Sequence, residues 1–267
     1  MMMKVLIPSK CFSKFNYSKY KTGDEYTEEQ RKDNATGAMI LLYLGMNTNR
    51  YINNNSYTTT IKELLELFCS TANVKGDVCQ KYIKDIRKSF RLITEETAWN
   101  VSSFTPVDFD TIRLNTPFTL EINIVQWLDK ELHQKTGTIS VKQYKVIMKP
   151  KYRNLRIAMV QVLGYISSNW TKLRAGYDKI QVTVQAIANY TGLSTKTVSK
   201  ILKILKQEKL IYRQNRKKRN IQEYVKDKKT GKYIYGANIY YLNLGGYKAK
   251  RSTSKHYFIK RKEIQTA

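Results

Sequence analysis

The segment 183–205 limits the fold of this chain more than any other part of the sequence. Thr183 can cap a short helix that runs to Tyr190, because its hydroxyl can accept a hydrogen bond from an unpaired N–H of the first turn. Gly192 follows where a helix commonly ends in a left-handed conformation. Ser194 can then cap a second helix. The spacing predicts two short helices joined by a tight turn.

The second of these helices has two chemically different faces. Its apolar residues recur at i, i+3, i+4 and i+7, and they are Val198, Ile201, Leu202 and Leu205. The opposite face is basic. A helix-turn-helix needs this division, because one face packs on the preceding helix and the other enters the major groove. The candidate DNA-binding residues here are Ser194, Thr195, Lys196, Thr197, Ser199, Lys200 and Lys203. The alternative is an ordinary amphipathic surface helix.

A basic hairpin follows the two helices. After a short strand near Tyr212, strand-like runs at 221–225 and 233–241 flank the turn 226–232, which contains Gly231. Strands around a basic tip predict a wing that reaches phosphates or the minor groove. The candidate residues of the wing and of the loop before it are Arg213, Arg216, Lys217, Lys218, Arg219, Lys228, Lys229 and Lys232.

Residues 180–245 resemble the helix-turn-helix and first wing strand of bacterial winged-helix regulators of the MarR and GntR types. The residues that carry the likeness are Ile187, Ala188, Thr191, Gly192, Leu193, Ser194, Thr197, Val198, Leu202, Leu205, Leu210 and Ile211. The resemblance implies a winged-helix DNA-binding domain and leaves its biological role open.

Positive charge is concentrated in the same part of the chain. The 267 residues carry 48 Lys and Arg against 21 Asp and Glu, a net charge of +27. Residues 1–110 contribute +2, residues 111–150 contribute +3 and residues 151–267 contribute +22. A coat that serves solubility mixes both signs, so this asymmetry indicates a polyanionic partner, double-stranded DNA.

The N-terminal half repeats the layout with less charge. We expect a helix at about 27–46, a second one that starts at Thr60, and a third with Cys79, Tyr82, Ile83, Ile86 and Phe90 on its apolar face. The third helix offers Lys81, Lys84, Arg87 and Lys88 as candidate DNA contacts. An extended run from Leu92 to Phe104 and a strand from Phe118 to Ile124 follow. We interpret this half as a second, degenerate winged helix; the alternative is a helical dimerisation or partner-binding domain.

The predicted fold class is therefore α+β, mainly helical, with two winged-helix domains in tandem. The expected boundaries are 1–124 for the N-terminal domain, 125–150 for a helical linker with Gly137 near the end of its helix, 151–247 for the C-terminal domain and 248–267 for a basic tail.

Several function classes lack their signatures. Three cysteines without a CxxC pair and two isolated histidines argue against a disulfide framework and a zinc site. Thr230-Gly231-Lys232 lacks the upstream glycine of a P-loop. We expect no catalysis, no cofactor and no metal. No apolar stretch suits a secretory signal or a bilayer span, so we expect a reduced, cytoplasmic protein without a membrane partner.

We predict sequence-specific binding to duplex DNA. The overall layout is similar to that of tandem winged-helix plasmid replication initiators, whose two unequal modules would suit repeated origin sites. A transcriptional regulator is the first alternative, although such regulators usually gain a second winged helix by dimerising. A protein-interaction adaptor is the second. The candidate partners besides DNA are a second copy of the chain and host replication or transcription proteins.

Overall fold

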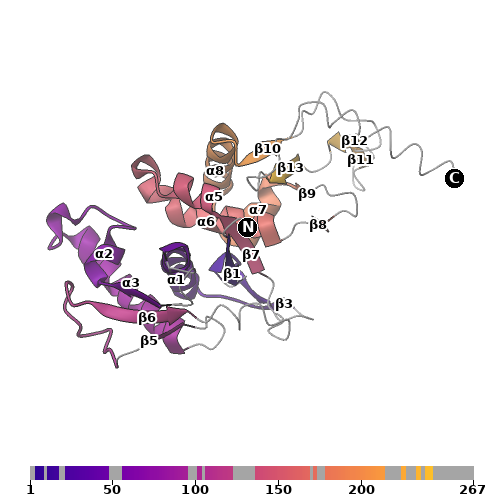
Figure 1. The fold of residues 1–267 in the computed structure, drawn as a ribbon. Helices are drawn as coiled ribbons and strands as arrows, with labels where there is room; N and C mark the ends of the chain where they lie inside the picture. Colours follow the sequence, from indigo (N-terminus) through magenta and orange to yellow (C-terminus); the bar gives the residue numbers. More distant parts are fainter. Residues whose placement is uncertain are drawn as a thin grey trace.

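A computed structural model describes residues 4–8, 11–17, 22–47, 56–95, 101–103, 106–122, 136–168, 171–172, 178–213, 224–226, 233–235 and 238–242. Within these ranges the protein is α+β and mainly helical, with small antiparallel sheets, as the sequence predicts. Two units built from similar elements lie side by side (Figure 1).

The N-terminal unit comprises α1 to β6. Its elements are α1 (Glu28–Asn47), β4 (Ser56–Thr59), α2 (Ile61–Leu65), the 3-10 turn η3 (Thr71–Asn73), α3 (Asp77–Glu95), β5 (Val101–Ser103) and β6 (Phe118–Ile122). Thr60 caps α2 as predicted, since the Glu63 N–H donates to its hydroxyl at 3.1 Å. Thr27 and Gln30 exchange the reciprocal hydrogen bonds of a capping box at the start of α1.

The C-terminal unit comprises α6 to β13. Its elements are α6 (Arg156–Ser168), β8 (Thr171–Lys172), β9 (Asp178–Val182), α7 (Val184–Thr191), α8 (Thr195–Gln207), β10 (Ile211–Arg213), β11 (Tyr224–Lys226), β12 (Tyr233–Tyr235) and β13 (Asn238–Leu242). Strands β11 and β12 pair as an antiparallel hairpin that brings Lys226 opposite Tyr233. The pairing of β11 with β12 confirms the hairpin predicted between the runs 221–225 and 233–241.

The two units share one order of elements. Each has a helix, a strand, two helices and then two more strands: α1-β4-α2-α3-β5-β6 in the first unit and α6-β9-α7-α8-β10-β13 in the second, apart from β8 and the hairpin β11–β12. In both sheets the last strand lies between the other two and pairs with them antiparallel, in the orders β4-β6-β5 and β9-β13-β10.

The segments outside the units connect them. Strand β1 (Lys4–Pro8) pairs antiparallel with β7 (Thr136–Ser140), and β2 (Phe15–Tyr17) pairs with β3 (Thr22–Glu25). Helix α5 (Val141–Ile147) and the 3-10 helix η5 (Pro150–Leu155) lead into α6.

Two expectations about secondary structure are wrong, one in a connecting segment and one in α3. Gly137 lies in strand β7 and not near the end of a helix. The prediction of a helical linker at 125–150 is therefore wrong for residues 136–140, while residues 123–135 lie outside the described ranges. Pairing with β1, far away in sequence, makes this stretch a strand. Likewise, Leu92 does not begin an extended run, because α3 continues to Glu95 and buries Ile93 one turn after Phe90.

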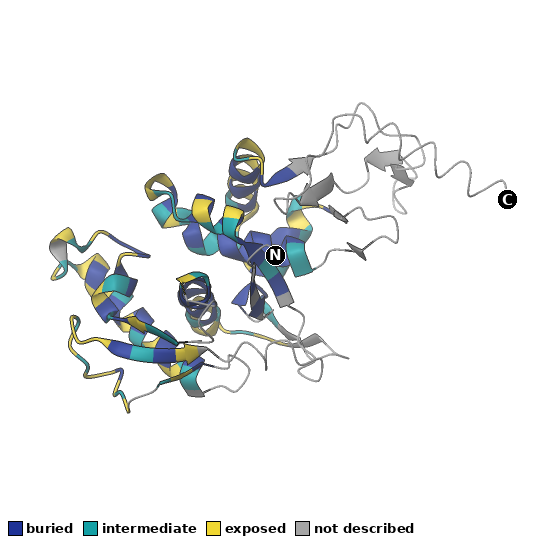
Figure 2. Ribbon diagram, viewed as in Figure 1, coloured by how far each residue is buried: buried dark blue, intermediate teal, exposed yellow. Residues whose placement is uncertain are grey.

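One continuous hydrophobic core joins the two units. Figure 2 shows that buried residues converge on α1, α6, β1 and β7 at the centre of the molecule. Helix α1 packs against both α3 and α6. In α1 the five consecutive residues 38–42 are fully buried, and in α6 the burial extends around the helix rather than along one stripe. Helices that are apolar on all sides belong in the interior.

Glycines allow β7 and α6 to approach backbone to backbone. A Cβ at Gly137 would lie 2.7 Å from the Cα of Gly164, and a Cβ at Gly164 would lie 2.6 Å from Cδ1 of the Phe12 ring. Any side chain at either position would therefore separate the strand from the helix or displace Phe12. The two glycines thus allow β7 and Phe12 of the N-terminal segment to pack closely against α6.

A buried arginine fastens the C-terminal unit to the N-terminal one. Arg156 begins α6 and is 4% exposed. Its Nη1 donates to the carbonyls of Glu66 (3.2 Å) and Leu67 (2.7 Å), which follow α2. Its Nε and Nη2 donate to the carbonyls of Ile147 (3.3 Å) and Met148 (2.8 Å) at the end of α5. Because carbonyls at helix ends carry partial negative charge, they can compensate the buried cation.

Candidate nucleic-acid interface

Helices α7 and α8 meet at the turn that the sequence predicts. The Thr183 hydroxyl accepts from the Ala186 N–H at 3.0 Å and caps α7. Gly192 ends α7 with φ of +73°, and its N–H donates to the Ala188 carbonyl at 2.9 Å. The Ser194 hydroxyl then accepts from the Thr197 N–H at 3.1 Å and caps α8. All three predicted signals are confirmed.

Helix α8 buries one face and exposes the other. Its buried residues are Val198, Ile201, Leu202, Ile204 and Leu205. Burial of each such side chain contributes about 1.5–3 kcal/mol, so this face holds the helix on the core. The exposed residues are Thr195, Lys196, Ser199, Lys200, Lys203, Lys206 and Gln207, while Thr197 is half-buried. Within the described part of the chain, Lys196, Lys200 and Lys203 form no ion pair.

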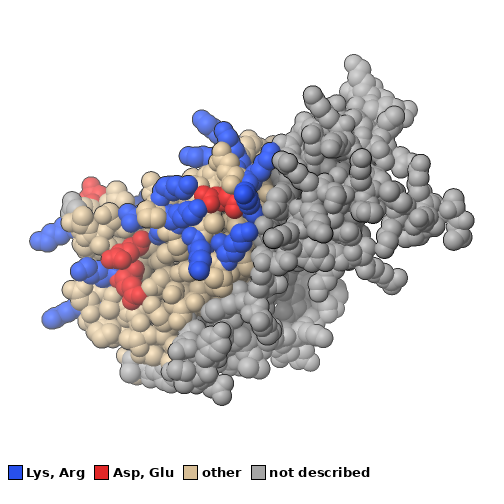
Figure 3. All heavy atoms as spheres, turned by 45° about the horizontal axis from the view of Figure 1, so that its top comes forward, with Lys and Arg blue, Asp and Glu red and all other residues tan. Residues whose placement is uncertain are grey.

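Lys206 is a further basic residue of this face that the sequence analysis did not select. It continues the three-residue spacing of Lys200 and Lys203 into the last turn of α8, so the same pattern could have identified it. Lys and Arg side chains project from the part of the surface on which α5 and α8 lie, which Figure 3 turns toward the reader. The exposed side of the second helix is thus strongly electropositive.

The N-terminal segment holds the start of this motif in place. The Lys14 N–H donates to the Tyr190 carbonyl at the end of α7. The buried Phe12 ring stacks on the Tyr190 ring with a centroid separation of 6.4 Å. The centroids of the Tyr165 and Tyr190 rings are 4.6 Å apart. No local pattern predicts the contacts of Phe12 and Lys14 with Tyr190, because they join residues more than 170 positions apart.

Arg31 of α1 reaches the turn itself. A Cβ at Gly192 would lie 2.6 Å from Arg31 Nη1. Glycine is therefore favoured at this position for two reasons: its backbone is left-handed, and the guanidinium lies where a side chain would begin. Arg31 also lies 3.8 Å from Glu25 Oε1, which forms a closer ion pair with Lys14 at 2.7 Å. A cation of the N-terminal unit therefore borders the turn between α7 and α8.

A charged cluster anchors the end of α8. Glu208 accepts hydrogen bonds from Lys149 Nζ and from the Tyr152 hydroxyl (2.7 Å), and Lys151 lies 3.2 Å away. The pKa of Glu208 is lowered to about 2, most strongly by the hydrogen bond from Lys149 and next by the one from Tyr152. Lys209 takes a left-handed φ of 57°, which lets the Leu210 N–H reach the Leu205 carbonyl at 2.8 Å and end the helix.

Residues 161–224 match the family model of the Crp-like helix-turn-helix domain. The C-terminal unit thus contains a helix-turn-helix of the DNA-binding winged-helix class, which confirms the broad resemblance drawn from the sequence, although the matching family is not one of the two named there. A comparison with curated proteins gives no match to the chain.

The structure describes the predicted wing only in its strands. Arg213 ends β10 opposite Tyr240 of β13. The other predicted wing and loop residues lie outside the described ranges, and they are Arg216, Lys217, Lys218, Arg219, Lys228, Lys229 and Lys232. The basic tail 248–267 lies outside them as well. Their roles stay predictions.

Helix α3 of the N-terminal unit carries the second set of predicted contacts, and the structure divides this set. Lys81 and Lys84 are exposed. Lys88 forms ion pairs with Glu29 and, at 3.2 Å, with Asp33, both on α1. Arg87 donates to the backbone carbonyls of Asp110 and Ile112. The charge of Lys88 is thus already compensated, and Arg87 supports the loop beside α3.

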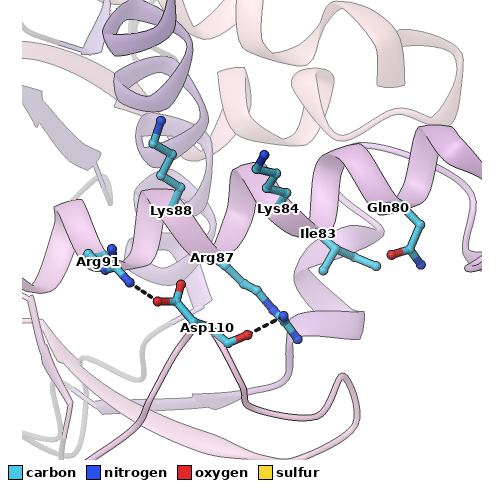
Figure 4. Close-up of a pocket in the computed structure, with 7 residues that line it drawn as sticks. All are labelled: Gln80, Ile83, Lys84, Arg87, Lys88, Arg91 and Asp110. Atoms are coloured by element: carbon cyan, nitrogen blue, oxygen red, sulfur yellow. Dashed lines mark hydrogen bonds and ion pairs between the residues drawn. The ribbon is translucent and has the colours of Figure 1, made fainter.

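A shallow hollow of about 390 Å³ lies along the same helix (Figure 4). Its lining residues are Gln80, Ile83, Lys84, Arg87, Lys88, Arg91 and Asp110. Figure 4 shows Lys84 and Lys88 projecting to one side, whereas Arg87 and Arg91 turn toward Asp110. Arg91 pairs with the Asp110 carboxylate. Most of the cations here have a partner within the protein, whereas the lysines of α8 form no ion pair with the residues that the structure describes.

The described residues contain no cluster of three His, Cys, Asp or Glu side chains that could hold a metal ion. A search of the same residues finds no helix whose length and apolar character would let it cross a membrane.

Proposed function

We propose that the protein binds duplex DNA in a sequence-specific manner, with α8 as the helix that enters the major groove. The observation that carries this proposal is the division of α8, whose apolar stripe is buried while its lysines are exposed and form no ion pair with the described residues. Thr195 and Lys196 lie at the N-terminal end of the helix, where base contacts of a helix-turn-helix concentrate. The +22 charge of residues 151–267 would supply the attraction to phosphates.

We further propose that the N-terminal unit is a second winged helix. Its order of elements and strands matches that of the C-terminal unit, with α3 in the place of α8. Lys81 and Lys84 are its available cations, so we expect it to contribute weakly and mainly through linkage to the stronger module. Dimerisation or partner binding through this unit is the competing role.

Two unequal DNA-reading modules in one chain favour a replication initiator of a plasmid or mobile element, which would bind repeated origin sites. The match to a Crp-like domain equally suits a transcriptional regulator, and this is the second candidate. The high positive charge argues against an adaptor that binds proteins alone. Homodimer formation and contacts with host replication or transcription proteins are part of the proposal, as is the lack of catalysis.

Selection of bound fragments from a random duplex pool would test the function and separate the two roles. Directly repeated sites support an initiator, whereas a single palindrome supports a promoter-binding regulator. The matched control is a folded variant in which Lys196, Lys200 and Lys203 are alanine, which should enrich no sequence. If the unaltered protein also enriches no sequence, sequence-specific binding is wrong.

A further inference from the structure

Two buried cysteine side chains face each other between α2 and α3. Cys69 follows α2 and is 8% exposed, and Cys79 lies in the first turn of α3 and is 4% exposed. Their sulfur atoms are 3.0 Å apart. Both thiols are free. A disulfide bond is about 2.05 Å long, so a further approach of about 1 Å would bring the two sulfurs to bonding distance.

The surroundings favour a reaction between these two thiols rather than with other groups. The Cys79 thiol also donates to the Ser70 carbonyl at 3.3 Å, which holds it beside the turn. Phe68 and Tyr82 stack next to the pair with a centroid separation of 5.4 Å. Cys11, the remaining cysteine, is buried in the N-terminal segment near Tyr26 and pairs with neither sulfur.

We propose that Cys69 and Cys79 form a modification site, a dithiol that a small hydroperoxide oxidises to an intramolecular disulfide. The bond would close the loop 69–79 and tie the end of α2 to the start of α3. This position corresponds to the turn between α7 and α8 in the other unit. The proposal rests on the contact between the sulfurs and does not depend on the DNA-binding function.

The reaction balances with hydrogen peroxide as the oxidant. One thiolate sulfur attacks a peroxide oxygen, the O–O bond breaks, and the other oxygen takes up a proton and leaves as water, which leaves a sulfenic acid. The second sulfur then attacks the sulfenic sulfur, the S–S bond forms, and the hydroxide that leaves takes the remaining proton as a second water. The two sulfurs lose two electrons in total, and the peroxide gains two.

Burial, together with the neighbouring Cys79, raises the pKa of the Cys69 thiol to about 12. Since the thiolate is the reactive form, Cys69 reacts slowly on its own at neutral pH. We therefore expect oxidation to be slower than that of an exposed thiol and to require a small oxidant that can reach the interior.

Peptide mapping of the full-length chain tests the proposal. The protein is treated with hydrogen peroxide, denatured, alkylated and digested with trypsin. Cleavage after Lys75 separates the two cysteines, so the disulfide would join peptides 63–75 and 76–81. We expect this linked pair, a mass about 2 Da lower than that of the reduced peptides, and about tenfold less alkylation of Cys69 and Cys79, all reversed by dithiothreitol. Cys11, in peptide 11–14, should stay fully alkylated.

Variants sharpen the result. Cys11→Ser should form the same disulfide at the same rate, while Cys69→Ser should form no intramolecular bond. Because the unaltered chain gives the decisive peptide map, the test does not depend on whether Cys69→Ser folds. Full alkylation of both cysteines after treatment, a bond to Cys11, or only intermolecular disulfides would overturn the proposal.

Discussion

Helices α3 and α8 hold the same place in the order of their units, yet their polar faces differ. The lysines of α8 project without ion pairs in the described part of the chain, whereas Lys88 of α3 pairs with Glu29 and Asp33. Both helices bury an apolar stripe, although α3 also buries Asp85 and Ser89. The apolar pattern thus determines how such a unit folds, and the placement of acidic neighbours determines how strongly it can attract DNA.

The largest expected effect is on the free energy of unfolding, and it tests whether the buried faces of α3 and α8 contribute similarly to the core. Ile201 of α8 and Ile86 of α3 are both 0% exposed. Ile201→Ala and Ile86→Ala should each lower the free energy of unfolding by about 2–5 kcal/mol, since both leave a cavity in the core. Urea denaturation measures this. If either variant matches the original protein, the assignment of that helix face is wrong.

A second substitution tests whether the units form one body. Arg156→Leu would leave the carbonyls of Leu67 and Met148 without their donor, and should lower the free energy of unfolding by about 2–4 kcal/mol. Lys142→Ala, on the exposed side of α5, is the control and should change it by less than about 0.5 kcal/mol. Two separate unfolding transitions in the original protein would argue against a shared core.

A third pair of variants compares the polar faces directly. Lys200→Ala should weaken binding to the preferred duplex by about 1–3 kcal/mol if it contacts a base. Lys81 and Lys84 replaced together by alanine should cost less than about 1 kcal/mol, because the N-terminal unit has little net charge to add. Binding isotherms with circular dichroism of each variant provide the measurement. A larger loss from the α3 variant would reverse the assignment of the stronger module.

The smallest effect concerns the end of α8. The hydrogen bonds of Lys149, Tyr152 and Lys151 lower the pKa of Glu208 from 4.5 to about 2. These contacts therefore stabilise the folded state above pH 4.5 and lose their effect as the pH falls through 2. Glu208→Gln should lower the melting temperature at pH 7 by about 2–4 °C, and this difference should vanish near pH 2. Glu121→Gln, on the exposed side of β6, should change little at either pH. A difference that persists at pH 2 would point to packing instead.

Sequence reasoning succeeded where the cause is local. Thr60, Thr183 and Ser194 cap their helices as predicted, and Gly192 adopts the left-handed conformation expected of it. Each of these depends on hydrogen bonds within three or four residues, so the nearby sequence contains the signal.

Contacts between distant residues could not be predicted in the same way. The pairing of β1 with β7 turned an expected helix into a strand at Gly137. Arg31 at the Gly192 turn and the acidic partners of Lys88 depend on how α1 packs. The sequence showed which residues were charged, but their availability for DNA depends on these tertiary neighbours.

The dependence of DNA affinity on salt tests the central claim most directly. If the exposed face of α8 and the basic C-terminal unit grip duplex DNA, the slope of log K against log salt should be about −5 to −7. Replacing Lys196, Lys200 and Lys203 by alanine should make it shallower by about two to three, while the same change at Lys81, Lys84 and Lys88 should alter it by less than about one. A slope shallower than about −2 in the original protein, or equal slopes in the α8 variant and the original, would contradict the account.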